Sequence, residues 1–450
     1  MTKAGVSMGA RSERIIWWQL HPVSFLGAEH HALPESAPPV HRLAQLDPWL
    51  DYLVELGCDG LALGPVFASS THGYDTVDHL RIDPRLGTDE DFDHLVTACR
   101  ARGVKLLLDG VFNHVGRDFG PFRDVLAHGA SSSYASWFRL DFEAGGPDGF
   151  GYADFEGHRC LVALNHAEPA VQDYVWGVMD HWLRRGAYGW RLDAAYAVPS
   201  AFWRTVTDRV RADHPDAWFL GEVIHGDYTA AVRDGGLDSV TQYELWKALR
   251  SCLNDRNFFE LAWALDRHDG FAEAFRPLTF VGNHDVTRLA SALEDPRHLP
   301  HALAVLFTVA GTPSVYAGDE QAFQGVKYER ADGDAEIRPA FPSGPAGLAP
   351  YGWPVHRLHQ DLIGLRRRNP WLTRARVQVS QLDNQSFAYR VTDPDAGTPG
   401  LAVLLNVSDA PVAFPSLDPS AKRLLGSAGS PQSGHRLEPH GWAVLELQQP

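Results

Sequence analysis

Short apolar runs alternate with amphipathic segments of helical length over most of the chain, and this alternation limits the possible folds more than any other feature. The candidate strands are eight: IIWWQL (15–20), GLALGPV (60–66), KLLLDGV (105–111), GWRLDAA (189–195), WFLGEV (218–223), SVTQYEL (239–245), LTFVGNHD (278–285) and SVYAGDE (314–320). Between them, segments such as residues 171–182 repeat apolar side chains at intervals of three and four, the period of a helix with one buried face. Strands that alternate with helices predict a parallel sheet covered by helices.

Eight strand and helix repeats close naturally into a (β/α)8 barrel, the TIM barrel of the α/β class. The structural alternative is a doubly wound open sheet. We favour the barrel because the first strand-to-helix turn lacks a GxGxxG motif, and because polar residues recur at the ends of many strands.

Two regions interrupt the alternation. Residues 115–168 are rich in Gly, Ser, Asp and aromatic residues and are too long for an ordinary loop, so they predict a small subdomain over the barrel mouth. After residue 370 the helical period disappears, and short runs of strand type follow, which predict a C-terminal antiparallel β-sandwich. The expected domains are the barrel (1–114 and 169–370), the inserted subdomain (115–168) and the sandwich (371–450).

Composition narrows the classes of partner. The chain is 44% hydrophobic, enough to bury a large core, and its net charge of -16 disfavours nucleic acid, whose phosphates require clustered Lys and Arg. The four cysteines, Cys58, Cys99, Cys160 and Cys252, are scattered without a CxxC pair, which argues for reduced thiols. The N-terminal stretch has no apolar run of leader type, and no window has the length of a membrane span. We expect a cytoplasmic protein with a neutral ligand and no membrane partner, of open oligomeric state.

The run GWRLDAA carries a full charge pair on one face of a strand. In a closed barrel, Trp190 and Leu192 should point outward to the helices, whereas Arg191 and Asp193 should point inward at the open top. An Arg beside an Asp favours the ionised carboxylate that a nucleophile needs. A lone pair of this kind is more often a structural salt bridge.

Further polar side chains end other predicted strands: Asp109, Asn113 and His114 the third, Glu222 the fifth, and Asn283, His284 and Asp285 the seventh. Each acid alone could be a helix cap or a loop acceptor. Three acids that converge at one mouth cost energy unless a function requires them. Two carboxyl groups about 5 Å apart, one ionised and one protonated, are what glycoside cleavage with retention needs. We expect neighbouring anions to raise the pKa of Glu222.

The ordered segments DGVFNH, GWRLDAA, FLGEV and VGNHD resemble the four signature regions of the α-amylase superfamily, glycoside hydrolase family 13. GYDTVDHLRIDPRLGT, LVALNHAEP, GTPSVYAGDE and IRPAF match the family as well, so the resemblance runs from about residue 15 into the C-terminal region.

The resemblance implies that Asp193 is the nucleophile, Glu222 the general acid/base, and Asp285 the third carboxylate, which stabilises the sugar in the transition state. It implies that Asp109 braces the site from behind. It assigns substrate binding to Tyr74, Asp75, His114, Arg191, Tyr196, His225, Asn283, His284 and Arg338.

The chain departs from the family at several positions. Many starch-binding relatives carry Lys-His soon after the nucleophile, whereas this chain has AAYAVP with Tyr196 there. Segments after the third and fifth strands resemble the cyclomaltodextrinase and neopullulanase branch, but the barrel begins almost at once, without the N-terminal domain of that branch. The family's calcium site would lie near Asn113 and Asn165. Ala163 stands where relatives often have an Asp, so one expected calcium ligand is missing. We therefore expect no required cofactor, and we keep calcium as a possible ligand.

Together these features predict a retaining hydrolase of short α-glucans, such as malto-oligosaccharides or cyclodextrins, with a neutral oligosaccharide as substrate. One alternative is a transglucosylase, in which a sugar hydroxyl replaces water in the second step. A second alternative is a non-catalytic carbohydrate-binding relative, which should lack one of the three acids.

Overall fold

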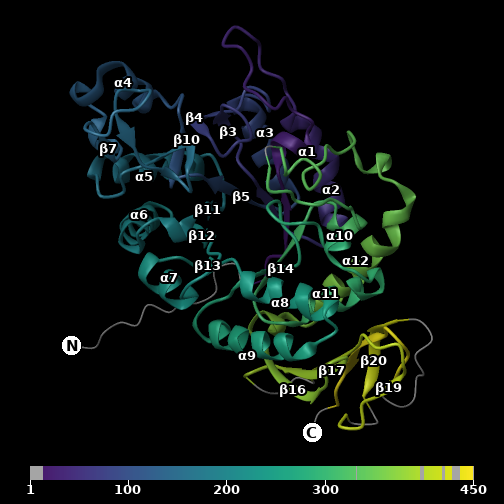
Figure 1. Ribbon diagram of the computed structural model, residues 1–450. Coiled ribbons are helices and arrows are strands. Elements are labelled where there is room, and N and C mark those ends of the chain that lie inside the picture. Colours follow the sequence, from purple (N-terminus) through teal and green to yellow (C-terminus); the bar gives the residue numbers. More distant parts are fainter. Residues whose placement is uncertain (1–13, 331, 396–399, 418–420, 428–435, 449–450) are drawn as a thin grey trace.

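Eight parallel strands form the central sheet of the computed structural model, which describes residues 14–330, 332–395, 400–417, 421–427 and 436–448 (Figure 1). The strands are β1 (Trp17–Leu20), β2 (Gly60–Leu63), β5 (Lys105–Gly110), β11 (Gly189–Leu192), β12 (Trp218–Gly221), β13 (Ser239–Val240), β14 (Leu278–Phe280) and β15 (Thr312–Tyr316). Each predicted run overlaps one of them. Residues 1–13, which include most of the N-terminal stretch without a leader pattern, lie outside the described residues.

The sheet closes on itself. Its order is β13-β12-β11-β5-β2-β1-β15-β14, and the two end strands meet at a parallel bridge between Thr241 and Leu278. The Gln242 backbone N–H donates to the Leu278 carbonyl oxygen at 2.9 Å across the same seam. The predicted (β/α)8 barrel is therefore confirmed, and the alternative of an open doubly wound sheet is wrong.

Alternate strand residues divide between two cores. Trp17, Trp218 and Leu107 belong to a small cluster inside the barrel, where the Trp17 and Trp218 rings stack at 5.4 Å. Trp190 and Leu192 belong to the large core between sheet and helices, as predicted. This packed interior floor leaves the carboxyl ends of the strands as the place for a site.

Nine helices of eight or more residues surround the sheet within the described barrel residues (Figure 1). They are α2 (Asp47–Leu56), α3 (Asp89–Ala101), α5 (Pro169–Arg184), α6 (Ser200–Asp213), α7 (Tyr228–Gly235), α8 (Tyr243–Asn254), α9 (Phe258–Ala274), α11 (Leu299–Thr308) and α12 (Trp353–Arg368). In α5 the side chains of Val171, Val175, Val178 and Trp182 are buried, so the predicted apolar face packs on the sheet. No described helix has the length and apolarity needed to cross a membrane.

The long segment after β5 has its own structure. Strands β6 (His114–Gly116), β9 (Asp154–Phe155) and β10 (His158–Ala163) form an antiparallel sheet, accompanied by α4 (Gly120–His128) and the pair β7 (Leu140–Asp141) and β8 (Gly151–Tyr152). This segment lies close to the hairpin of β3 (Phe67–Ser69) and β4 (Thr76–Ile82): a Cβ on Gly116 would lie 2.4 Å from the Asp75 carbonyl oxygen. Glycine at this position therefore allows the two backbones to approach.

The C-terminal region is antiparallel. Strands β16 (Arg376–Leu382), β17 (Ser386–Thr392), β18 (Leu401–Asn406), β22 (Trp442–Glu446) and β20 (Lys422–Gly426) form one sheet, and β19 (Val412–Ala413) pairs with β21 (Arg436–Leu437). One face of the sheet joins the main core through Tyr389, whose hydroxyl lies 2.9 Å from Thr308 Oγ1 in α11. The other face packs Leu404 against Phe414 and Leu437. The predicted C-terminal β-domain is thus present, with β19, β20 and β21 in addition to the expected strands.

Candidate active site

The guanidinium of Arg191 lies at the centre of the barrel mouth and binds three carboxylates. Its Nη1 is 2.8 Å from both oxygens of Asp109 and 2.9 Å from Asp193 Oδ1, and its Nη2 is 2.6 Å from Glu222 Oε1. All four side chains are almost fully buried. The acids come from the ends of three neighbouring strands, β5, β11 and β12.

Sheet register puts these side chains at one level. Arg191 lies opposite Asp109 in the parallel pairing of β11 with β5. The Asp193 backbone N–H continues this ladder to the Gly110 carbonyl at 3.0 Å, and that of Glu222 reaches the Leu192 carbonyl at 2.9 Å. The predicted inward direction of Arg191 and Asp193 is therefore confirmed.

Glu222 is held by the turn that follows Asp193. Its Oε2 accepts the Ala194 backbone N–H at 2.9 Å, and Ala194 has a left-handed φ of 44°. Such a conformation is unfavourable for a residue with a Cβ, and it persists where surrounding contacts enforce it. The Tyr243 hydroxyl donates to Glu222 Oε1 at 3.4 Å and itself accepts from Asn283 Nδ2 at 2.9 Å. The carboxyl group is thus oriented from two sides.

Asp285 lies across the mouth, after β14. Arg338 Nη2 donates to its Oδ1 at 2.7 Å, and His284 Nε2 is 3.0 Å from its Oδ2. Arg338 also donates from Nε to the His284 carbonyl at 2.8 Å. The Asp285 side chain is 31% exposed, against less than a tenth for Asp193 and Glu222, so it is the carboxylate most open to the solvent.

Tyr74 joins the two sides of the cluster. Its hydroxyl donates to Asp109 Oδ2 at 3.2 Å and contacts His284 Nε2, while the Tyr74 and His284 rings lie parallel at 5.6 Å. His114 Nε2 bonds to the Tyr74 carbonyl at 3.1 Å, and the His114 ring stacks on Phe155 of the inserted segment at 4.7 Å. Both ring nitrogens of His114 have protein partners, because Nδ1 lies 3.1 Å from Asn113 Nδ2. Its predicted bond to a sugar hydroxyl stays a prediction.

Three other predicted residues lie outside this cluster of carboxylates. Both oxygens of Asp75 accept hydrogen bonds from Thr71, at 3.0 and 2.7 Å, which fixes the loop before β4. The Tyr196 hydroxyl donates to Glu156 of the inserted segment at 2.9 Å, and the Tyr196 ring lies 5.5 Å from that of His225. A recess of about 280 Å³ is lined by Tyr196, His225 and residues next to Asp193 and Glu222 in sequence.

Asn113 and Asn165, the residues near which calcium was expected, make contacts within the protein. The Asn165 side-chain amide donates to the Ser136 carbonyl at 2.8 Å, and its oxygen accepts from the Ala167 backbone at 3.3 Å. Asn113 donates its amide to the His114 ring. The two side chains therefore already stabilise the inserted segment, and a calcium ion beside them stays a prediction.

Sequence reasoning missed three residues of the site. Gln19 Nε2 lies 3.2 Å from His284 Nδ1, and the His21 ring is parallel to those of Tyr74 and His284. Tyr243 contacts Glu222. Gln19 and His21 are polar residues at the end of the first predicted strand, so the signal that marked Asp109 and Glu222 was present there as well.

Burial dominates the protonation of the acids around Arg191. It raises the pKa of Asp109 to about 7, although Arg191 acts in the opposite direction. It also raises the pKa of Glu222, as expected, with Arg191 opposing and Asp193 adding to the rise. The pKa of Asp193 is raised by burial too, and Arg191 only partly offsets this, so the arginine alone does not fix Asp193 as an anion. One cation among three buried carboxylates favours the retention of protons.

Asp285 has the opposite protonation. Burial acts to raise its pKa, but His284, Arg338 and Arg191 together outweigh burial and hold the pKa well below the usual range. The mouth therefore combines one carboxyl group of lowered pKa, Asp285, with three whose pKa is raised. Paired acids whose environments push their pKa values apart are typical of acid/base catalysis.

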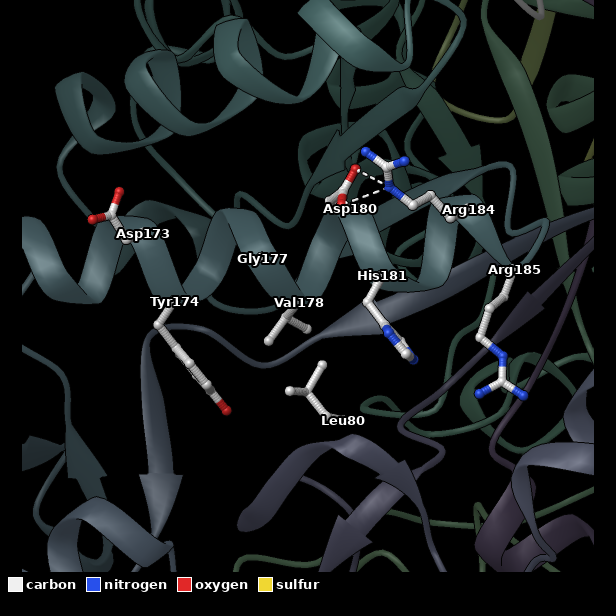
Figure 2. Close-up of a pocket in the computed structure, with 9 residues that line it drawn as sticks. All are labelled: Leu80, Asp173, Tyr174, Gly177, Val178, Asp180, His181, Arg184 and Arg185. Atoms are coloured by element: carbon white, nitrogen blue, oxygen red, sulfur yellow. Dashed lines mark hydrogen bonds and ion pairs between the residues drawn. The ribbon is translucent and has the colours of Figure 1, made fainter.

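A larger cavity, of about 480 Å³, lies on α5 and away from these acids. Figure 2 shows Tyr174, Val178 and His181 pointing from α5 to the same side as Leu80, with the Asp180 and Arg184 pair elsewhere on the helix. Asp180 is already bound by Arg184 at 2.8 Å and by His214 at 2.9 Å, and Arg185 by Asp93 at 2.9 Å. The charged groups there are paired, so the acids at the strand ends remain the candidate active site.

Comparison with known proteins finds related sequences for most of the chain. The family model described as the alpha amylase catalytic domain matches residues 46–343. A cyclomaltodextrinase of Geobacillus thermopakistaniensis is 30% identical over 89% of this chain and 70% of its own length. Neopullulanase 2 of Thermoactinomyces vulgaris is 34% identical over 76% of this chain and 58% of its own length. The chain thus spans between 58% and 70% of these two relatives.

Among solved structures, the cyclic alpha-maltosyl-(1→6)-maltose hydrolase of Arthrobacter globiformis, in complex with that cyclic sugar, has a TM-score of 0.79 to this chain. The two are 25% identical, and the alignment covers 96% of this chain and 98% of the hydrolase. Similarity therefore extends over the barrel, the inserted segment and the C-terminal sheet.

Proposed function

The chain belongs to the alpha-amylase family of glycoside hydrolases, and from this premise we propose that it hydrolyses short α-glucans, such as malto-oligosaccharides or cyclodextrins, with retention of configuration. The observation that carries the proposal is the guanidinium of Arg191, which binds Asp193 at 2.9 Å and Glu222 at 2.6 Å. Two carboxyl groups on one guanidinium are close neighbours, as double displacement requires.

In the first step, Glu222 donates a proton to the glycosidic oxygen while Asp193 attacks the anomeric carbon. The bond to the leaving sugar breaks, and an ester forms between the glucosyl unit and Asp193. The raised pKa of Glu222 suits this role, because the group keeps its proton to higher pH than a free glutamic acid. Arg191 favours the ionised form of Asp193 against the effect of burial.

In the second step, Glu222 accepts a proton from water, and the oxygen of that water attacks the anomeric carbon of the ester. Asp193 leaves as a carboxylate, and the sugar is released with its original configuration. Asp285, kept ionised by His284 and Arg338, stabilises positive charge on the ring in both transition states. Tyr74 offers its ring, parallel to His284, as a surface beneath the sugar.

A short substrate is supported by the surroundings of Tyr196. The bond from Tyr196 to Glu156 joins the turn after Asp193 to the inserted segment, which narrows the mouth on that side. The recess beside it has a volume of about 280 Å³, slightly below the usual range of small-ligand sites. One of the two curated relatives is named for a cyclic maltodextrin.

The proposal includes the domain limits and the location of the protein. We assign the barrel to residues 1–114 and 169–370, the subdomain to 115–168 and the C-terminal domain to 371–450. A cytoplasmic location is supported by the four free cysteines, three of them buried. Limited proteolysis with mass spectrometry tests the limits, and fractionation of the source cells tests the location.

Product analysis tests the function. Maltotriose, a cyclodextrin and starch are supplied to the purified protein, and proton NMR records which anomer is released first. We expect the α anomer, and faster turnover of the two short substrates than of starch. Release of the β anomer overturns retention, and products longer than maltotriose identify a transglucosylase instead. No turnover of any α-glucoside, including α-glucosyl fluoride, identifies a non-catalytic binding protein.

A further inference from the structure

A second group of polar side chains lies where the barrel meets the C-terminal domain. Asp295 and His298 stand just before α11, and His440 lies in the turn before β22. Both histidines are almost fully buried, and Asp295 is 17% exposed. These three are the one group of three or more His, Cys, Asp or Glu in the described part of the chain whose ligand atoms come within reach of one ion.

The separations of the three ligand atoms fit one small cation. His298 Nε2 is 2.9 Å from His440 Nδ1, Asp295 Oδ2 is 3.9 Å from His298 Nε2, and Asp295 Oδ2 is 3.7 Å from His440 Nδ1. Tetrahedral zinc with bonds of about 2.0–2.1 Å sets its ligands about 3.3 Å apart. The observed distances lie on both sides of that value, so small side-chain rotations bring all three atoms into the shell.

Asp409 adds the contact that a metal-bound histidine usually has. His440 Nε2 lies 2.8 Å from Asp409 Oδ1, so the N–H faces the carboxylate and Nδ1 is left as the acceptor. Ligating histidines typically donate their other ring N–H to a carboxylate, which fixes the tautomer. Asp409 is in turn held by Arg256 Nη1 at 3.0 Å. The Nδ1 lone pair of His440 therefore points at His298 and Asp295.

We propose that Asp295, His298 and His440 bind one zinc ion, with Asp409 as the carboxylate behind His440. Two imidazole nitrogens and one carboxylate oxygen suit zinc better than calcium or magnesium, which prefer oxygen ligands throughout. Water completes the fourth position. The ion ties the segment before α11 to the turn before β22, and thereby holds the C-terminal domain on the barrel.

Arg297 competes for one of the ligands. Its Nη2 lies 2.7 Å from Asp295 Oδ2, the oxygen that faces the histidines, while its Nε lies 3.0 Å from Oδ1. The Arg297 side chain is 58% exposed, so it can keep Oδ1 and release Oδ2 to the ion. In the structure the same residues form a hydrogen-bonded chain from Asp409 through His440 to His298.

The test is a zinc titration of the full chain. Cys160, the exposed thiol, is first replaced by serine to remove a competing ligand. Protein stripped with EDTA is then titrated with zinc chloride against a chromophoric chelator. We expect one tight equivalent per chain, lost in His298→Gln and in His440→Gln. His94→Gln is the matched control, since His94 pairs with Asp47 at 2.8 Å on the surface, and it should bind zinc as the parent does.

Asp409→Asn gives a second test, which does not require the replacement of a buried side chain. Asp409 is 73% exposed, so its replacement leaves the packing intact, and zinc affinity should fall about 10- to 100-fold. Zinc should raise the melting temperature of the parent and of His94→Gln, but not of His440→Gln. The proposal is overturned if the parent takes up no more zinc than the double variant His298→Gln/His440→Gln, or if zinc leaves its melting temperature unchanged.

Discussion

Two buried arginines, Arg85 and Arg191, show how differently one side chain can be used in this molecule. Arg85 is fully buried and pairs with a single carboxylate, Asp83, through Nη2 at 2.7 Å and Nε at 2.9 Å. Its Nη1 donates to backbone carbonyls, among them Glu29 at 2.9 Å and His30 at 3.1 Å, and its Nη2 also donates to the Ser69 hydroxyl oxygen at 2.6 Å. Charge is balanced there, and the arginine ties several loop segments together.

Arg191 faces three carboxylates instead of one. Asp109, Asp193 and Glu222 surround it, and Tyr74, Ala194 and Tyr243 make further contacts with these acids. A structural ion pair gains nothing from two additional buried anions, because each costs desolvation energy. The comparison teaches that an excess of like charge around a buried partner, rather than a buried ion pair as such, marks the functional site.

The strongest way to separate the two arginine sites is to remove Asp193, the proposed nucleophile. Asp193→Ala should lower kcat on maltotriose by about 10⁴-fold or more, because no ester can form. The free energy of unfolding should stay within about 1 kcal/mol of the parent value, since one of several crowded carboxylates is removed. Kinetics together with urea unfolding measure both effects. Asp173→Ala, at a surface pair with Arg209, is the control for activity. If Asp193→Ala loses stability but keeps its turnover, the carboxylates around Arg191 have a structural role like that of Asp83 beside Arg85.

Replacement of the acid should have the next largest effect. Glu222→Gln removes proton donation and should slow maltotriose cleavage by about 10²- to 10⁴-fold. Ester formation from α-glucosyl fluoride should be far less affected, because fluoride leaves without a proton. Fluoride release from α-glucosyl fluoride and glucose release from maltotriose measure the two rates. Equal losses on both would mean that Glu222 only holds Arg191 and the Ala194 turn in place.

At Arg85 the expected effect is on stability alone. Arg85→Met leaves Asp83 buried without a cation and should cost about 3–5 kcal/mol of unfolding free energy. Molecules that remain folded should keep their turnover, measured per active site. Arg184→Met, at an exposed pair with Asp180, should shift the urea midpoint much less. If Arg85→Met removes activity while the urea midpoint is unchanged, Arg85 belongs to the catalytic machinery.

The smallest expected effect is a displacement of the pH profile. Activity requires ionised Asp193 and protonated Glu222, so it falls as pH drops through the pKa of Asp193 and as pH rises through that of Glu222. Both pKa values are raised by burial, so both limbs should lie at higher pH than those of free carboxylic acids. The dependence of kcat/KM on pH reports the two values for the site as a whole. A profile centred near pH 4 contradicts the raised values.

Strand ends were predictable because they combine two local signals. An apolar alternation of period two identifies the strand, and a polar residue at its carboxyl end identifies the mouth, which is how Asp109, Asp193 and Glu222 were found. Arg191 and Asp193 could be assigned to the interior for the same reason, since alternation decides which face a residue takes.

The sixth predicted strand shows where local signals fail. Only Ser239 and Val240 of SVTQYEL are a strand, and α8 begins at Tyr243 because the Gln242 side chain accepts the Leu245 N–H and caps the helix. Over four residues, a polar residue that caps a helix gives the same sequence pattern as a polar residue at the end of a strand. Tyr243 was therefore counted with the strand, and its contact with Glu222 was not foreseen.

Contacts between distant parts of the chain leave no local pattern at all. His298 and His440 are 142 residues apart, and nothing near either of them in sequence marks the other as a partner. The four-carboxylate mouth could be assembled only because a known barrel geometry brings strand ends together. No comparable rule exists for the surface where the C-terminal sheet packs on the barrel.

The weakest joint of the cylinder runs between β13 and β14, where one bridge and one neighbouring backbone bond replace a full ladder. Side chains reinforce it above: Asn283, just after β14, reaches Tyr243, which in turn reaches Glu222. The closure of the barrel and the orientation of Glu222, the proposed proton donor, thus depend on the same two hydrogen bonds. If β13 and β14 separate locally on warming, Glu222 should lose its orientation before the protein unfolds. Amide exchange at Thr241 and Gln242 should therefore rise as turnover falls.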